Sequence, residues 1–182
     1  MLKSQPDRYG AVVVTIHWLT AILILTLYVT GFSAVANADS AAEALFLRLH
    51  VPLGIIVLLL TVARLIWWWL ADRKPRPMAS VPRWQEGLAR IVHVTLYIVL
   101  FGMFGSGIAL MALSGAGAVL FGTGTLPDLT SFAPFGVHGG SAMLLLLLLA
   151  LHIGAALYHH FVRHDGIFRR MWYGRDKAGA KL

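Results

Sequence analysis

Apolar residues in this 182-residue chain gather into four long runs separated by shorter polar segments. The runs cover residues of about 11–33, 49–70, 88–113 and 136–163. A helix rises about 1.5 Å per residue, so each run can cross the roughly 30 Å hydrocarbon core of a bilayer. Because a lipid-exposed span must pair its own backbone groups, the pattern predicts an all-α integral membrane protein. We expect one four-helix transmembrane bundle over residues 1–182.

Basic residues are concentrated in three of the segments outside these runs. They precede the first span, lie between the second and third, and follow the fourth: Lys3, Arg8, Arg73, Lys74, Arg76, Arg83, Arg163, Arg169, Arg170, Arg175, Lys177 and Lys181. The other two connections, 34–48 and 114–135, contain only Arg48. Lysine and arginine accumulate in cytoplasmic segments of membrane proteins. The bias predicts a multi-pass protein of the bacterial inner membrane with both termini in the cytoplasm.

The polar segments also carry structural signals. Residues 72–85, DRKPRPMASVPRWQ, contain three prolines, so we expect a solvated loop with neither helix nor strand. In the tail, 164–182, the stretch DGIFRRMWYGRDK interleaves apolar residues with arginines, which is typical of a short helix in the headgroup region; a disordered basic tail is the alternative. The N-terminus has no small-residue cleavage site before a long apolar run, so we expect a retained first helix.

Composition narrows the class of protein further. The chain is 58% hydrophobic and 13% charged, with a mean hydropathy of +0.75. Its pI is about 10.3, but the basic residues lie between apolar runs rather than on one face of a soluble module, which argues against nucleic-acid binding. There is no cysteine, which excludes disulfides, thiolate-ligated iron–sulfur clusters and covalent c-type haem attachment. Any haem must be held non-covalently.

Five of the eight histidines, His17, His50, His93, His138 and His152, lie within the predicted spans. Ionisable groups at that depth are costly in lipid and usually face the bundle interior or a cofactor. His138 and His152 are fourteen residues apart on one span, which places them about 40° apart around the helix axis and about 21 Å apart along it. One helix therefore offers imidazoles at two depths, and a haem with two histidine ligands needs a partner at each.

The second histidine at each level can be assigned from its predicted depth in the membrane. His50 opens the second span on the predicted periplasmic side, as His138 opens the fourth. His17 and His152 lie at similar distances inside the predicted cytoplasmic charges. The sequence thus predicts two haem b groups, with iron ligated by His50 and His138 near the periplasm and by His17 and His152 near the cytoplasm.

A fourteen-residue spacing recurs on the other spans. Fourteen residues after the histidines of the first, second and third spans come Gly31, Arg64 and Gly107. Glycine at these levels would let a flat porphyrin approach the backbone, and Arg64 would neutralise a haem propionate. Ordinary helix contacts for the glycines and an arginine that reaches for the membrane surface are the alternatives.

Two further histidines have open roles. His93 lies at about the depth of His17, so it can replace a cytoplasmic ligand, hydrogen-bond a propionate or a quinone, or simply bind a backbone carbonyl. His159 follows His152 by seven residues, on the same face and about 10 Å nearer the cytoplasm. A quinone headgroup would meet the inner haem there, whereas binding of a lipid phosphate is the alternative.

Other classes of membrane protein fit less well. A copper or zinc site needs ligands that converge at one depth, whereas these histidines divide between two levels. Transporters need paired acids or interrupted helices, and the spans contain no aspartate. The H-E-x-x-H motif of metalloproteases is absent. Haem binding remains the best explanation.

The chain resembles the bacterial cytochrome b561 family over nearly its whole length. The resemblance is carried by RYGAVVVTIHWL, LHVPLGIIVLLLTVARL and HGGSAMLLLLLLALHIGAALYHHFVRHDGIFRRM, and the last is the most specific. The same four-histidine plan resembles the cytochrome b subunits of formate dehydrogenases and nickel hydrogenases. The resemblance implies that His17 and His152 ligate the cytoplasmic haem and that His50 and His138 ligate the periplasmic one.

The resemblance further implies electron exchange with ubiquinone and, in one branch, oxidation of periplasmic superoxide. A superoxide site should be electropositive, yet the periplasmic connections carry Arg48 against Asp39, Glu43 and Asp128. Two hypotheses therefore remain: a superoxide:ubiquinone oxidoreductase, which needs no partner protein, and an electron-transfer module for an unidentified dehydrogenase or other redox partner.

Overall fold

The computed structural model describes residues 1–38, 40–78 and 81–173, and the fold over these residues is helical without strands. Its four long helices are α1 (Ala11–Ala36), α2 (Ala41–Leu70), α3 (Arg83–Ser114) and α5 (Ala133–Tyr158). The short elements are α4 (Ala116–Leu120), the 3-10 turns η1 (Leu129–Ser131) and η3 (Phe168–Met171), and the π-helical turn η2 (His159–Arg163). Each long helix is apolar and long enough to cross a membrane, which confirms the four predicted spans.

The helices extend beyond the apolar runs. α2 begins at Ala41 rather than near residue 49, because the stretch AAEALFLR is made of good helix formers that continue past the hydrocarbon core. α3 begins at Arg83, so the prediction of an entirely non-helical 72–85 loop is wrong for its last three residues. Pro82 precedes that helix as its N-cap residue, and no later proline interrupts it.

Two connections contain structure that the sequence did not predict or predicted differently. Between α3 and α5 the chain forms α4 and η1, and Gly115 joins α3 to α4 at a φ of 69°, which favours glycine. The interfacial helix expected after the fourth span is a single 3-10 turn, η3. Residues 174–182 of the expected tail, with Arg175, Lys177 and Lys181, lie outside the described residues.

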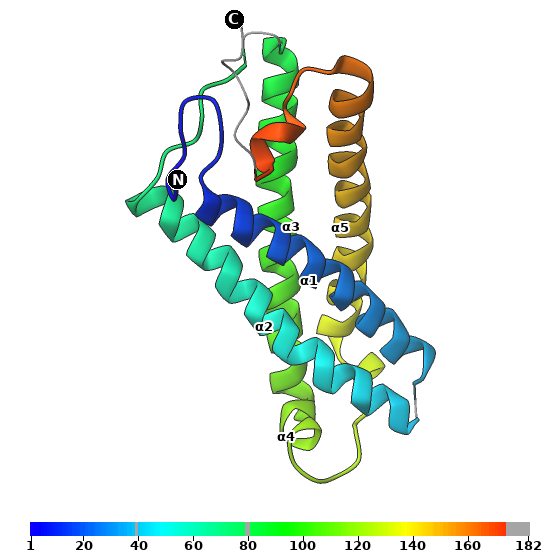
Figure 1. Ribbon diagram of the computed structural model, residues 1–182. Helices are drawn as coiled ribbons and strands as arrows, with labels where there is room; N and C mark the ends of the chain where they lie inside the picture. The colour runs from blue at the N-terminus through cyan, green and yellow to red at the C-terminus, as the bar shows by residue number, and fades with distance from the viewer. Residues whose placement is uncertain (39, 79–80, 174–182) are drawn as a thin grey trace, which may run out of the picture.

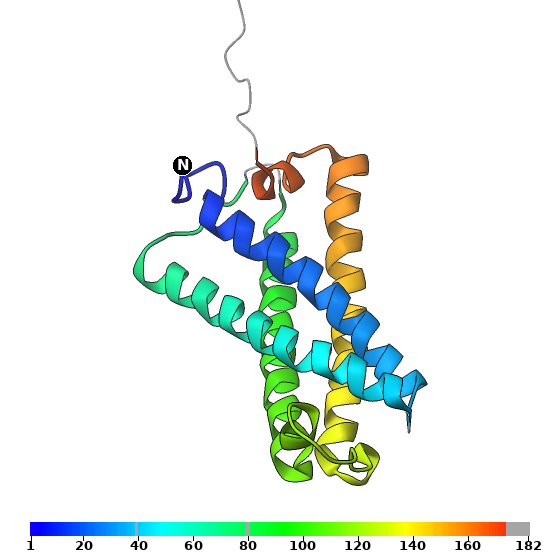
Figure 2. The same ribbon diagram turned by 60° about the horizontal axis from the view of Figure 1, so that its bottom comes forward.

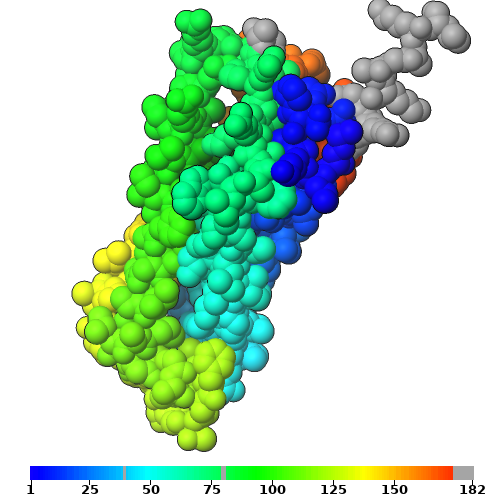
Figure 3. Space-filling view, turned by 90° about the vertical axis from the view of Figure 1, so that its left-hand side faces the viewer, coloured from blue at the N-terminus to red at the C-terminus, as the bar shows by residue number. Residues whose placement is uncertain are grey.

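The four long helices form two antiparallel pairs. α1 packs along α2 and α3 packs along α5, whereas the two pairs touch each other at few points. Figures 1 and 2 show the α1–α2 pair crossing the α3–α5 pair obliquely. Figure 3 shows the face on which α2 and α3 lie side by side. Large apolar side chains such as Ile22, Leu59 and Ile98 are 60–66% exposed, as expected of a surface that faces lipid.

Residues 1–10, the connection from α2 to α3 and residues 164–173 meet at one end of the bundle, which we call the terminal end (Figure 1). α4 lies at the opposite end, which we call the loop end. This arrangement agrees with the prediction that the three basic segments share one side of the membrane. Which side that is stays a prediction.

Asp72 ties the N-terminal segment to the end of α2. Its carboxylate accepts hydrogen bonds from the backbone N–H and hydroxyl of Ser4, from the Trp67 indole and from the Arg73 backbone. Burial alone would raise the pKa of this carboxyl, but these hydrogen bonds outweigh it and lower the pKa below its usual value. The charged form is therefore the one that holds the two segments together.

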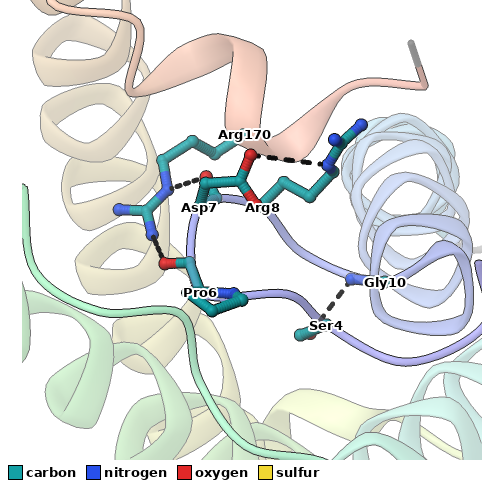
Figure 4. Close-up of polar contacts among 6 residues, drawn as sticks. All are labelled: Ser4, Pro6, Asp7, Arg8, Gly10 and Arg170. Atoms are coloured by element: carbon teal, nitrogen blue, oxygen red, sulfur yellow. Dashed lines mark hydrogen bonds and ion pairs between the residues drawn. The ribbon is translucent and has the colours of Figure 1, made fainter. Parts of the chain in front are cut away.

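Arg170 makes a second junction at the terminal end. Its guanidinium donates to the backbone carbonyls of Asp7 at 2.9 Å, Pro6 at 3.4 Å and Arg76 at 2.8 Å. Its own carbonyl accepts from the Tyr9 N–H. Figure 4 shows the side chain reaching across to the N-terminal loop. The N-terminal loop, the connection after α2 and η3, which are distant in sequence, are thus joined at the terminal end.

Two histidine clusters as the candidate functional site

A cavity of about 1300 Å³ lies between the two helix pairs toward the loop end. All four long helices contribute to its walls, including His50 from α2 and His138 from α5. The rings of these two histidines face each other, with centroids 6.1 Å apart and planes inclined by 71°. The structure therefore brings together the two side chains that the sequence paired at the periplasmic level.

A second cluster lies nearer the terminal end. His17 from α1 and His152 from α5 have ring centroids 6.3 Å apart, with planes inclined by 71°. His93 from α3 lies closer to His152, at 5.1 Å between centroids. Arg64 from α2 approaches His17, with Nη1 3.3 Å from Nδ1. All four residues expected at the cytoplasmic level are thus neighbours.

The spacing of the rings fits two imidazoles on opposite sides of one iron. A bond from a metal to an imidazole nitrogen is about 2 Å long, and the ring centre lies about 1 Å beyond that nitrogen, so two opposed ligands have centroids about 6 Å apart. The pairs at 6.1 and 6.3 Å match this separation. The His93–His152 pair, at 5.1 Å, is too close for it. His93 is therefore the poorer ligand candidate at the terminal end.

The donor set also favours a haem over a bare metal ion. Nowhere in the described parts of the chain do three histidine, aspartate or glutamate side chains converge to hold a metal ion. A haem iron needs only two protein ligands, because the porphyrin nitrogens supply the other four. The two facing pairs suit that requirement.

The histidines at the loop end are held by hydroxyl groups that sequence reasoning missed. The Nδ1 atom of His50 lies 3.1 Å from Thr30 Oγ1, and the Nδ1 atom of His138 lies 3.1 Å from Ser106 Oγ. Both hydroxyls belong to residues that directly precede Gly31 or Gly107 in the chain. That adjacency is the one signal in the sequence that points to them.

Gly31 and Gly107 give the imidazole rings room. A Cβ atom at Gly31 would lie 3.1 Å from Cε1 of His50, and one at Gly107 would lie 3.2 Å from Cε1 of His138. Both distances are shorter than ordinary van der Waals contact. The absent side chains therefore let α1 and α3 approach the histidine rings, a role distinct from the predicted contact with porphyrin.

Arg64 carries an unused donor. Its Nε atom is buried without a hydrogen-bond partner, while Nη1 donates to Nδ1 of His17. Arginine has no acceptor, so this contact requires the His17 ring proton on Nε2. Binding of a metal through Nε2 would move that proton to Nδ1 and free Arg64 for an anion such as a propionate. The residues at this level thus fit a haem carboxylate.

His159 lies beyond the terminal-end cluster, at the start of η2. Its Nδ1 bonds to the carboxylate of Asp165, and the two side chains are 15% and 5% exposed. Asp165 also accepts from the Ile167 N–H at 3.2 Å. Burial acts to raise the pKa of Asp165, but its bonds to His159 and Ile167 lower it overall. The sequence pattern alone did not indicate this partner of His159.

Four membrane-spanning helices around two facing pairs of histidines define a haem-binding class of membrane redox protein. The model of the prokaryotic cytochrome b561 family matches residues 8–174, and the chain belongs to that family. Membership implies b-type haem as the cofactor and electron transfer in a bacterial membrane as the function.

Similarity to individual relatives extends along the chain. The chain is 29% identical over 180 residues to cytochrome b561 homolog 2 of Escherichia coli K12, and the match covers 92% of this chain and 93% of the relative. It is 29% identical over 173 residues to homolog 1 of the same organism, covering 91% and 97%. It is 26% identical over 174 residues to a probable superoxide oxidase CybB of Yersinia pestis, covering 90% and 95%. No solved structure matches significantly.

Proposed function

We propose that this protein binds two b-type haems, one between His50 and His138 and one between His17 and His152. The observation that carries the proposal is the separation of the ring centroids, 6.1 Å for His50 and His138 and 6.3 Å for His17 and His152. In each case one histidine comes from the α1–α2 pair and the other from the α3–α5 pair. When bound, each haem supplies a one-electron redox centre. Arg64 would then pair with a propionate at the terminal end. Gly31 and Gly107 leave space beside the imidazole rings of His50 and His138.

Ligation can be tested one site at a time. Pyridine haemochrome assay should give two haems per chain in the wild type. His138→Ala should remove the loop-end haem and leave the other, and His17→Ala should do the reverse, as read from low-temperature spectra. His93→Ala should keep both. A stoichiometry of one, or loss of the terminal-end haem in His93→Ala but not in His17→Ala, would contradict the assignment.

The reaction that we propose is the oxidation of superoxide by ubiquinone. Each of two superoxide anions loses one electron and becomes dioxygen, and one ubiquinone takes up the two electrons with two protons to become ubiquinol. Superoxide would react at the loop end and quinone at the terminal end. Support comes from the cavity that reaches the loop end beside His50 and His138, and from the similarity to a relative named probable superoxide oxidase.

A pulse experiment tests the reaction directly. Pulse-generated superoxide added to the purified oxidised protein should reduce its haem, followed optically, and added ubiquinone should reoxidise it. Addition of superoxide dismutase before the pulse is the control and should abolish the reduction. Haem that stays oxidised after the pulse would exclude superoxide as the donor.

One observation favours a second function. The residues that line the cavity toward the loop end include Glu43, Asp128 and Arg48. The Arg48 guanidinium donates to the Leu120 carbonyl at 2.7 Å. Asp39, which was expected to add a negative charge, lies outside the described residues. This surface does not favour collection of an anion. An electron-transfer module that accepts electrons from a dehydrogenase or another redox partner protein is therefore the alternative, and the superoxide pulse separates the two.

We propose that quinone binds at the terminal end near His159. The bond to Asp165 fixes the ring through Nδ1, which leaves Nε2 to exchange a proton with quinone. His93 and Arg64 belong to the cluster one level deeper and would line the same approach. In His159→Ala, haem content should stay normal, while haem oxidation by a soluble ubiquinone analogue slows tenfold or more, about 1.4 kcal/mol of barrier. Unchanged oxidation kinetics would place the quinone elsewhere.

A further inference from the structure

We propose that the hydroxyl groups of Thr30 and Ser106 are positioning groups for the loop-end haem ligands, and that they lower the reduction potential of that haem. The inference rests on the proposed ligation by His50 and His138. It concerns residues of α1 and α3, neither of which supplies a loop-end ligand.

The other hydrogen-bond partners of each hydroxyl indicate the direction of its contact with the imidazole. Thr30 Oγ1 lies 3.0 Å from the Thr26 carbonyl and 3.2 Å from the Leu27 carbonyl. Ser106 Oγ lies 2.8 Å from the Gly102 carbonyl and 3.0 Å from the Met103 carbonyl. Carbonyl oxygens only accept, so each hydroxyl proton is directed to its own helix. The hydroxyl oxygen is then left to accept from the nearby imidazole.

His138 supplies independent support for this direction. Its Nδ1 atom lies 3.1 Å from the Met103 carbonyl as well as 3.1 Å from Ser106 Oγ. Because a carbonyl cannot donate, Nδ1 of His138 must carry the ring proton. The unprotonated nitrogen is Nε2, which is the atom free to bind iron. The Met103 carbonyl thus selects the tautomer that ligation requires, and in that tautomer Ser106 Oγ is a second acceptor for the same N–H.

The same device occurs in both helix pairs. In each pair the helix without the loop-end ligand presents a hydroxyl residue followed by glycine, Thr30–Gly31 in α1 and Ser106–Gly107 in α3. The hydroxyl contacts the histidine Nδ1, and the glycine leaves space at Cε1 of the same ring. Two unrelated packing accidents would not be expected to produce equal 3.1 Å contacts on both sides of one cavity.

The terminal end lacks this arrangement. There the Nδ1 atom of His17 faces the Arg64 guanidinium, which can only donate. A hydrogen bond from Nδ1–H to an acceptor makes an imidazole a stronger electron donor to its metal. Stronger donation stabilises ferric over ferrous iron. The hydroxyls should therefore lower the potential of the loop-end haem specifically.

The test is a potentiometric redox titration of the two haems in the full-length protein, combined with low-temperature electron paramagnetic resonance. Thr30→Val keeps the branched shape and removes the acceptor, and Ser106→Ala removes the other. Each should raise the midpoint potential of the loop-end haem, the double variant should raise it further, and the terminal-end haem should not change. Thr30→Ser should restore the wild-type value.

Thr61→Val is the matched control. Thr61 is a buried threonine of α2 whose hydroxyl donates to the Val57 carbonyl at 2.7 Å, and its loss should leave both potentials unchanged. A wild-type loop-end potential in Thr30→Val and Ser106→Ala overturns the inference. If Thr30→Val loses haem, a wild-type potential in Ser106→Ala still overturns it. A His50→Ala variant that keeps two haems would instead overturn the ligation on which the inference rests.

Discussion

At the scale of single residues, the loop-end site depends on atoms that are absent as much as on those present. Gly107 leaves the space into which Cε1 of His138 fits, 3.2 Å from where a Cβ would lie. Gly102, on the same helix, has nothing within 4 Å of its hypothetical Cβ. Two glycines of one membrane helix therefore have different structural consequences.

We predict that Gly107→Ala perturbs the loop-end haem, because the added methyl group forces the His138 ring to shift. The expected loss of folding stability is about 1–3 kcal/mol, as for other overpacked interiors. The electron paramagnetic resonance spectrum should change for that haem alone. Gly102→Ala is the control and should behave as wild type. Identical spectra and melting temperatures for Gly107→Ala and wild type would contradict the packing role.

The sequence predicted which histidines lie together, but not what holds them. A fourteen-residue spacing is close to a whole number of helical turns, so it reports which side chains share a face. Thr30 and Ser106 gave no comparable signal, because hydroxyl residues in membrane helices commonly bond to their own backbone. Only the position of the neighbouring helix shows that the oxygen also meets an imidazole.

At the scale of elements, the terminal end is organised by side chains that bind backbone carbonyls. Arg170 in η3 joins the N-terminal loop to the connection after α2, and Trp18 of α1 donates to the Met171 carbonyl at 2.7 Å. The Trp18 ring also contacts Phe168 and Trp172 edge-on. The short η3 turn is thus anchored to α1 by both polar and aromatic contacts.

We expect Arg170→Ala to destabilise the protein by about 0.5–1.5 kcal/mol, since it removes exposed hydrogen bonds that join two segments to η3. Thermal unfolding in detergent and limited proteolysis of the N-terminal loop would measure the effect. The neighbouring variant Arg169→Ala is the matched control, because the Arg169 side chain is exposed. Equal melting temperatures and cleavage rates for the two variants would show that the junction contributes no stability.

Element boundaries were the least predictable part of the fold. Hydropathy reports the length that faces hydrocarbon, whereas helices continue until a proline, a glycine or a capping group ends them. α2 therefore starts eight residues before the predicted span, at Ala41. The 3-10 turn η3, at Phe168–Met171, stands where a longer interfacial helix was expected.

At the scale of the whole molecule, the absence of cysteine makes orientation easy to test. We predict that Thr123→Cys, between α4 and α5, reacts with a membrane-impermeant maleimide in intact spheroplasts. Pro77→Cys, between α2 and α3, should react only after permeabilisation. The positive-inside distribution is the physical reason. The reverse pattern of labelling would invert the predicted topology and the direction of the proposed electron path.

The sequence predicted four spans and two ligand levels, but not how the helices pair. Each span is apolar around most of its surface, so no single face identifies its neighbour. In the structure α1 packs with α2 and α3 packs with α5, so each pair consists of two spans that follow one another in the sequence. The cavity between the pairs follows from that choice, since neither pair fills the space alone.

The two helix pairs are hairpins, and each proposed ligand pair is divided between them: His17 and His50 come from the first hairpin, and His138 and His152 from the second. Neither hairpin can complete a site by itself. A newly made chain could insert both hairpins into the membrane and still lack a continuous interior, because direct contact between them is sparse. Haem supply would then govern maturation, because a haem bound between ligands of both hairpins would join them.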